Sequence, residues 1–148
     1  MDVFVANEQD IPVDHDRLST LAAHTLQSED VDDEAELSVL FVTPEHMRRL
    51  NSHFAGDDYA TDVLSFPMLE GDPDDDDGPV LLGDVVVCPA VAERNAQKAG
   101  QPLTRELDML VVHGTLHLLG YDHQGSQDRS EMERRQRDIL ASFERVDS

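Results

Sequence analysis

The chain has 148 residues with one cysteine, and its 32 acidic residues against 11 basic ones give a formal net charge of −21. The length predicts one domain that needs no disulfide. No run approaches the roughly 20 apolar residues of a membrane span, and no signal pattern is present. We therefore expect a soluble cytoplasmic protein without a membrane partner. The acidic residues are spread along the whole chain. This favours a host with a salty cytoplasm, where salt screens repulsion from phosphate backbones, over a merely acidic protein with a disordered acidic loop.

The first half of the chain alternates between strand and helix patterns. Residues 2–6 alternate polar and apolar side chains as a strand does, and 16–27 place leucines on one helical face. A second strand is predicted over 36–42, followed by a helix over 44–54 that Thr43 and Pro44 begin. A third strand over 62–66 ends at a proline.

The second half begins with a low-complexity segment, 70–79, whose four adjacent aspartates lack the spacing of a calcium loop and predict a solvated acidic loop. A largely buried strand is predicted over 80–88, then helices over 89–99, from about 102 to 119, and over 126–145. These elements predict an α+β fold with a single domain over 1–148, in which a mixed sheet of about four strands packs with about five helices.

The run from His113 to His123 predicts a metal site on a helix and the turn after it. His113 and His117 are four residues apart, which places both imidazoles on one helical face. Gly120 allows the helix to end with positive φ, so that His123 returns toward the other two. Three histidines with one open position are typical of catalytic zinc, whereas structural zinc sites use several cysteines and this chain has only Cys88.

A metallopeptidase is disfavoured by the residue after the first histidine. The spacing of His117, Gly120 and His123 matches the second half of the zinc-protease pattern H-E-x-x-H-x-x-G-x-x-H. In those proteases a glutamate acts as general base where this chain has Gly114, which has no side chain to accept a proton.

Three segments together carry a family resemblance: the histidine run, the motif at 61–67 and the motif at 82–87. With these motifs the chain resembles the YbeY family of single-strand-specific metal-dependent endoribonucleases. The resemblance implies a bacterial cytoplasmic protein that matures the 3′ end of small-subunit ribosomal RNA and takes part in ribosome quality control. It implies one zinc ion as cofactor, and as partners single-stranded rRNA, the ribosome or its small subunit, and assembly factors.

The resemblance also implies roles for individual residues. His113, His117 and His123 match the family's metal ligands and act in catalysis through the metal. Thr61, Asp62, Ser65 and Phe66 match the strand motif beside the cleft, where a structural role and a substrate contact are equally expected. Asp122 is expected either to orient a ligand histidine or to serve only as a turn residue.

Two positions depart from the family pattern. The family commonly has an arginine where this chain has Ala55, and that arginine is suited to bind phosphate or a charged transition state. Arg48, Arg49 or His53 would have to substitute for it. At Gln136 the family usually has glutamate, which predicts a minor change in packing or hydrogen bonding.

The expected mechanism is hydrolysis or transfer at phosphorus, with metal-bound water or a ribose 2′-hydroxyl as the nucleophile. The first rival is a non-catalytic ribosome-assembly factor in which the metal holds the fold, and Ala55 favours it. The second rival is the metallopeptidase, which would have to act without the glutamate that Gly114 replaces.

Overall fold

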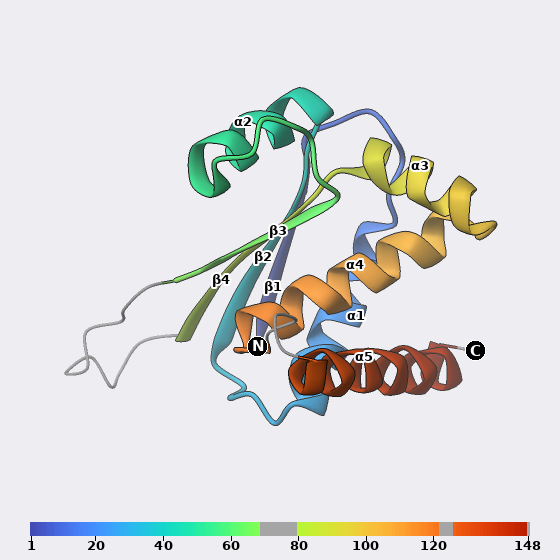
Figure 1. Ribbon diagram of the computed structural model, residues 1–148. Helices are drawn as coiled ribbons and strands as arrows, with labels where there is room; N and C mark the ends of the chain where they lie inside the picture. The colour runs from blue at the N-terminus through green and yellow to red at the C-terminus, as the bar shows by residue number, and fades with distance from the viewer. Residues whose placement is uncertain (69–79, 122–125, 148) are drawn as a thin grey trace.

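The strands form one mixed sheet in the computed structural model, which describes residues 1–68, 80–121 and 126–147 (Figure 1). Within these residues the sheet has four strands in the order β1-β2-β4-β3. β1 pairs with β2 and β2 with β4 in parallel, whereas β3 pairs with β4 antiparallel, so β1 and β3 are the edges. The strand bounds are β1 Asp2–Asn7, β2 Ala35–Phe41, β3 Val63–Pro67 and β4 Val80–Val87.

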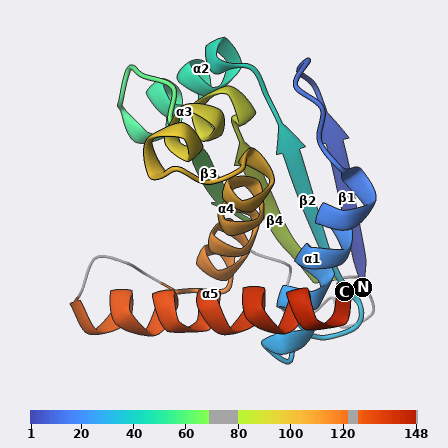
Figure 2. The same cartoon turned by 90° about the vertical axis from the view of Figure 1, so that its right-hand side faces the viewer.

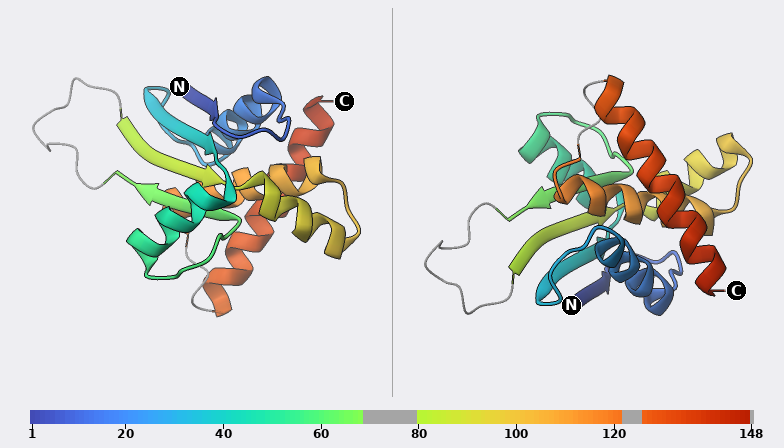
Figure 3. Two further views of the ribbon diagram at one scale, coloured as in Figure 1. Left: turned by 90° about the horizontal axis from the view of Figure 1, so that it is seen from above. Right: turned by 90° about the horizontal axis from the view of Figure 1, so that it is seen from below.

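Helices cover the two faces of this sheet unequally. α1, α4 and α5 lie on one face, and α2 lies on the other above β3 and β4 (Figures 1 and 3). Side chains cap two of these helices, because Asp14 accepts a hydrogen bond from the first turn of α1 and Thr43 from that of α2. The helix bounds are α1 His15–Ser28, α2 Pro44–Ala55, α3 Pro89–Ala99, α4 Leu103–Leu118 and α5 Ser126–Asp147.

The main core lies between the sheet and α1, α4 and α5. Every second residue of β2 is buried, and Leu37, Val39 and Phe41 join this core. The face toward α2 has a smaller core that includes Met47, Val86 and the free thiol Cys88. Figure 2 shows α5 running across the lower end of α4. α4 itself contacts β3, because Ser65 Oγ donates to the carbonyl oxygen of Gly114.

The predicted α+β fold is confirmed, with four strands and five helices in the part of the chain that the structure describes. The prediction of a largely buried strand over 80–88 is wrong for its first half, because only Val85 to Val87 of β4 are buried while Val80 and Leu81 are each 47% exposed. β3 reaches only to Gly83 in its pairing, so it does not pair with the start of β4. The predicted acidic loop at 70–79 lies outside the described residues, and no described helix is long and apolar enough to cross a membrane.

Candidate active site

Helix α4 carries two of the three predicted ligands and ends as its sequence predicts. His113 and His117 lie four residues apart on this helix, one turn from each other. Gly120 has φ +102°, and its N–H donates to His117 O while that of Tyr121 donates to Leu116 O, at 3.1 and 3.2 Å. This is a Schellman end, which reverses the chain immediately after the helix. Asp122 and His123 follow outside the described residues.

The reversed chain is anchored to two other helices through Glu29. Tyr121 Oη donates to one Glu29 oxygen at 2.7 Å, and Arg135 Nε of α5 donates to the other at 2.8 Å. Burial raises the pKa of the Tyr121 phenol, and its hydrogen bond to Glu29 adds to the rise. The Glu29 carboxylate, at the end of α1, therefore links α5 to the segment that leaves α4.

Gly114 allows α4 to approach the sheet closely. Its carbonyl oxygen accepts a hydrogen bond from Ser65 Oγ of β3 at 2.9 Å. A Cβ at this position would lie 2.5 Å from Val85 Cγ1 and 3.3 Å from Val63 Cγ2. The glycine is therefore required by packing, and a zinc-protease glutamate has no room here.

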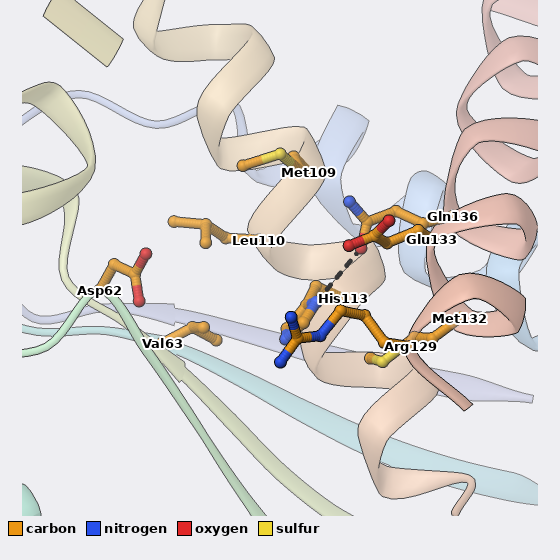
Figure 4. Close-up of a pocket in the computed structure, with 9 residues that line it drawn as sticks. All are labelled: Asp62, Val63, Met109, Leu110, His113, Arg129, Met132, Glu133 and Gln136. Atoms are coloured by element: carbon orange, nitrogen blue, oxygen red, sulfur yellow. Dashed lines mark hydrogen bonds between the residues drawn. The ribbon is translucent and has the colours of Figure 1, made fainter. Parts of the chain in front are cut away.

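Gln136 of α5 fixes the orientation of His113. Its Oε1 lies 3.2 Å from His113 Nδ1 (Figure 4). An amide oxygen accepts hydrogen bonds, so this contact favours the neutral tautomer that has its hydrogen on Nδ1 and its lone pair on Nε2. Gln136 predicts only a minor change in packing or hydrogen bonding from the sequence, whereas in the structure it contacts a predicted metal ligand.

A cleft of about 390 Å³ opens beside His113, between β3, α4 and α5. Figure 4 shows Asp62 on the β3 side of this cleft and Arg129 and Glu133 on the α5 side. Among the described residues that line the cleft, two carboxylates and one guanidinium give a net negative charge. This charge favours a bound cation. The cleft is lined by Asp62, Val63, Met109, Leu110, His113, Arg129, Met132, Glu133 and Gln136.

Of the predicted substrate contacts in the strand motif, Asp62 reaches the cleft. Its backbone oxygen accepts from Cys88 N at 2.9 Å, and its carboxylate accepts from Asn95 Nδ2 at 3.3 Å and from Thr61 Oγ1 at 3.4 Å. Ser65 uses its hydroxyl on the helix backbone. Thr61 and Ser65 thus hold neighbouring parts of the structure in place, and Asp62 faces the space that a ligand would occupy.

Arg48 and Arg49 line a different hollow, on α2, together with His53 and Asp58. Arg48 donates to both carboxylate oxygens of Asp58, at 2.6 and 3.1 Å, and this contact lowers the pKa of Asp58 and raises that of Arg48. Arg49 reaches Glu45 at 3.3 Å. Ala55, at the end of the same helix, is exposed.

Arg129, whose guanidinium lies in the cleft, is not among the residues predicted from the sequence motifs. A signal for it exists, because Arg129, Met132 and Gln136 follow the helical spacing i, i+3, i+7 on α5 and Met132 is buried. Arg129 therefore lies on the same face of α5 as Gln136.

Two of the three predicted metal ligands, His113 and His117, lie among the described residues, and their side chains suit a metal ion. The described residues contain no cluster of three or more histidine, cysteine, aspartate or glutamate side chains that could hold a metal, and the third predicted ligand, His123, lies outside them. Two features support the fit: the Gln136 contact leaves Nε2 of His113 in the form that binds metals, and the cleft carboxylates favour a cation. His113 and His117 therefore suit two positions of a histidine-rich site.

The fold and this cleft define a class: a single-domain α+β protein in which a histidine-bearing helix faces a cleft lined by acidic and basic side chains. The profile of the family described as Endoribonuclease YbeY matches residues 4–144. The chain belongs to the YbeY family, and by this membership it is a nuclease.

Similar proteins agree with this assignment over almost the full chain. The Endoribonuclease YbeY of Thermobifida fusca is 45% identical, covering 98% of this chain and 96% of that protein. The Endoribonuclease YbeY of Salinispora tropica is 44% identical, with 97% and 96% covered. The solution structure of TM1509 from Thermotoga maritima superimposes with a TM-score of 0.65 at 29% identity, over 95% of this chain and 88% of that one.

Proposed function

We propose that this protein is a zinc-dependent endoribonuclease that cleaves single-stranded RNA in the cytoplasm. Its proposed role is maturation of the small-subunit rRNA 3′ end and ribosome quality control, with the small subunit and assembly factors as partners. The observation that carries the proposal is the cleft that brings His113 of α4 together with Arg129 of α5 and Asp62 at the start of β3. Relatives named Endoribonuclease YbeY that share more than two fifths of the sequence support it.

The proposed ligands are His113, His117 and His123. These three histidines would hold zinc, which would supply Lewis-acid chemistry and a nucleophile near neutral pH. Gln136 holds His113 in the tautomer that such a site needs. Asp122 stays a proposed orienting residue for a ligand histidine.

The other residues of the cleft have roles that follow from their charge. Arg129 binds the phosphate by charge-assisted hydrogen bonds and stabilises the negative charge that grows as phosphorus is attacked. It thereby supplies the guanidinium that Ala55 does not. Asp62, oriented by Asn95 and Thr61, is placed to accept a hydrogen bond from a ribose hydroxyl or from the attacking group.

The test is cleavage of a single-stranded RNA by the purified chain, with added zinc and with a chelator. We expect cleavage that needs the metal and that falls by more than about 100-fold in His117→Ala. His15→Ala is the matched control, because His15 is exposed at the start of α1, and it should cleave normally. The assay is repeated at high salt, since a net charge of −21 repels RNA at low salt.

The second candidate function is a non-catalytic assembly factor, which the exposed Ala55 favours because the family arginine is missing there. RNA bound but uncut at every metal and salt concentration would support that factor and exclude the nuclease. The metallopeptidase has no such support, because the glutamate it needs would collide with Val85 at position 114.

A further inference from the structure

An exposed group of rings lies on α2 and β3, on the side of β3 away from α4. The Phe54 ring is 63% exposed. It packs edge-on against His53 with centroids 4.6 Å apart and against Phe66 of β3 at 5.0 Å. We call His53, Phe54 and Phe66 the Phe54 surface. Tyr59, 57% exposed, follows on the loop that Asn51 holds through the Tyr59 carbonyl oxygen.

The chemistry of this surface matches single-stranded nucleic acid. Exposed aromatic rings bind unpaired bases by stacking, and arginines beside them bind the phosphates between those bases. Arg48 and Arg49 stand on the same helix with side chains 59% and 68% exposed. Their partners Asp58 and Glu45 are equally open to water, and such exposed pairs exchange readily for phosphate.

The position of β3 connects this surface to the cleft. Val63 and Ser65 point to α4, where they contact Gly114, whereas Leu64 and Phe66 join the smaller core under α2. β3 is an edge strand, and among the described residues it pairs with β4 alone. The Phe54 surface and the cleft therefore lie on the two sides of the same strand.

The opposite edge of the sheet provides a contrast. Phe4 of β1 is 57% exposed, close to the value for Phe54. The ring contacts found among the described residues include Phe54 but not Phe4. Phe4 also follows the acidic Asp2 and precedes Glu8, whereas Phe54 follows two arginines on its helix. A lone exposed phenylalanine needs no functional explanation, but a ring group beside exposed arginines does.

We propose that the Phe54 surface stacks bases of the single-stranded RNA substrate while a neighbouring phosphate of the same strand lies in the cleft at His113. This rests on the proposed endoribonuclease function and adds to it how the substrate is held. Stacking on aromatic rings would add affinity for RNA that does not come from opposite charge, which matters for a chain with a net charge of −21.

The test measures binding separately from cleavage. The full chain with His117→Ala, which holds the RNA without cutting it, is titrated into a fluorescein-labelled single-stranded RNA dodecamer and followed by anisotropy. Adding Phe54→Ala should weaken binding by about tenfold or more, with the salt dependence unchanged. Phe54→Trp should restore binding, and Phe4→Ala should leave it within twofold. Thermal unfolding of each variant confirms that it is folded.

A Phe54→Ala protein that binds within twofold of its parent would overturn the proposal, and the ring group would then serve another partner such as a protein. Equal losses in Phe54→Ala and Phe4→Ala would also overturn it, because they would show a general effect of apolar surface. These outcomes are distinct from failure of the proposed function, which appears as absence of RNA cleavage by the chain with His117 and Phe54 intact.

Discussion

The two sides of edge strand β3 differ in how they are packed and in what they carry. On the α4 side, Ser65 donates to the backbone of Gly114 and the helix approaches so closely that no Cβ fits at that position. On the α2 side, Phe66 meets a ring that is 63% exposed. The α4 side is closely packed and carries the histidine helix, and the α2 side leaves aromatic area exposed.

This difference follows from what each task requires. Catalytic groups must be held within a fraction of an ångström, which close packing and hydrogen bonds to neighbours achieve. A stacking surface tolerates any base, so it can consist of exposed rings and loosely paired arginines. Changes on the α4 side should therefore affect turnover, metal affinity or folding, and changes on the α2 side should affect RNA affinity.

The largest effect is expected at Arg129, which extends into the cleft from α5 (Figure 4). Arg129→Ala should lower kcat/KM for RNA by about 100-fold, mostly in kcat, because the guanidinium acts on charge that develops in the transition state. Steady-state cleavage of a short RNA measures this. Arg134→Ala on the same helix is the control and should change little. A comparable loss in Arg49→Ala on the α2 side would contradict the division of tasks.

The next effect is on folding, at the contact between α4 and β3. Alanine normally stabilises an ordinary helical position by about 1 kcal/mol over glycine. Gly114→Ala should instead lower the free energy of unfolding by about 1–3 kcal/mol, because its Cβ would overlap Val85. Urea denaturation measures the change, and Gly114→Glu should not fold.

The control for that prediction removes the Val85 methyl group with which the new Cβ would overlap. In a Val85→Ala background, Gly114→Ala should cost less than it does alone, since the colliding methyl group is gone. A more stable Gly114→Ala protein would show that α4 does not need glycine to reach the sheet.

A smaller effect is expected at Gln136, which acts on His113 from the second helix of the cleft. Gln136→Leu should weaken zinc binding by about tenfold, because the imidazole loses the acceptor that fixes its tautomer. Competition with a chromophoric chelator measures the affinity. Gln136→Glu restores an acceptor and should bind zinc at least as tightly as the original chain. Unchanged affinity in the leucine variant would remove Gln136 from the metal site.

The smallest effect is expected at Tyr121, at the end of α4. Tyr121→Phe should cost about 1 kcal/mol of unfolding free energy at pH 8, because the hydrogen bond to Glu29 is lost. Since burial raises the pKa of Tyr121 in the folded chain, this stabilisation is complete below the ordinary phenol pKa of about 10 and is lost as pH rises through the raised value.

The measurement for Tyr121 is urea denaturation between pH 8 and pH 11. The original chain should lose stability over this range faster than Tyr121→Phe does. Tyr59→Phe is the control, because the Tyr59 side chain is exposed and its contact with Asn51 uses only the backbone. Parallel pH curves for the original chain and Tyr121→Phe would refute the assigned cause.

Several features of the fold and site could be predicted from sequence because local rules set them. Helical periodicity placed His113 and His117 on one face, and Gly120 ended the helix with the expected hydrogen bonds. The helix bounds differ from the predictions by only a few residues, because caps such as Thr43 act within a single turn. The three motifs likewise identified the family.

Other features depend on contacts between distant segments. The sequence shows only that position 114 is a glycine. The packing of α4 against the sheet shows that a side chain at this position would collide with Val85. Gln136 is 23 residues from His113, and their hydrogen bond exists because α5 crosses α4. The prediction that Val80 and Leu81 are buried is wrong for the same reason, since the composition of a strand does not reveal which neighbours cover it.

The sequence by itself therefore predicted a set of metal ligands and determined which family the chain resembles, since short-range spacing and turn chemistry carry both signals. Only the tertiary structure decided that Arg129 and His113 line one cleft, that Gln136 contacts that histidine, and that Phe54 meets Phe66 of β3, which is an edge strand among the described residues. The physical reason is that long-range packing positions these side chains, and no local pattern specifies which helix faces will meet.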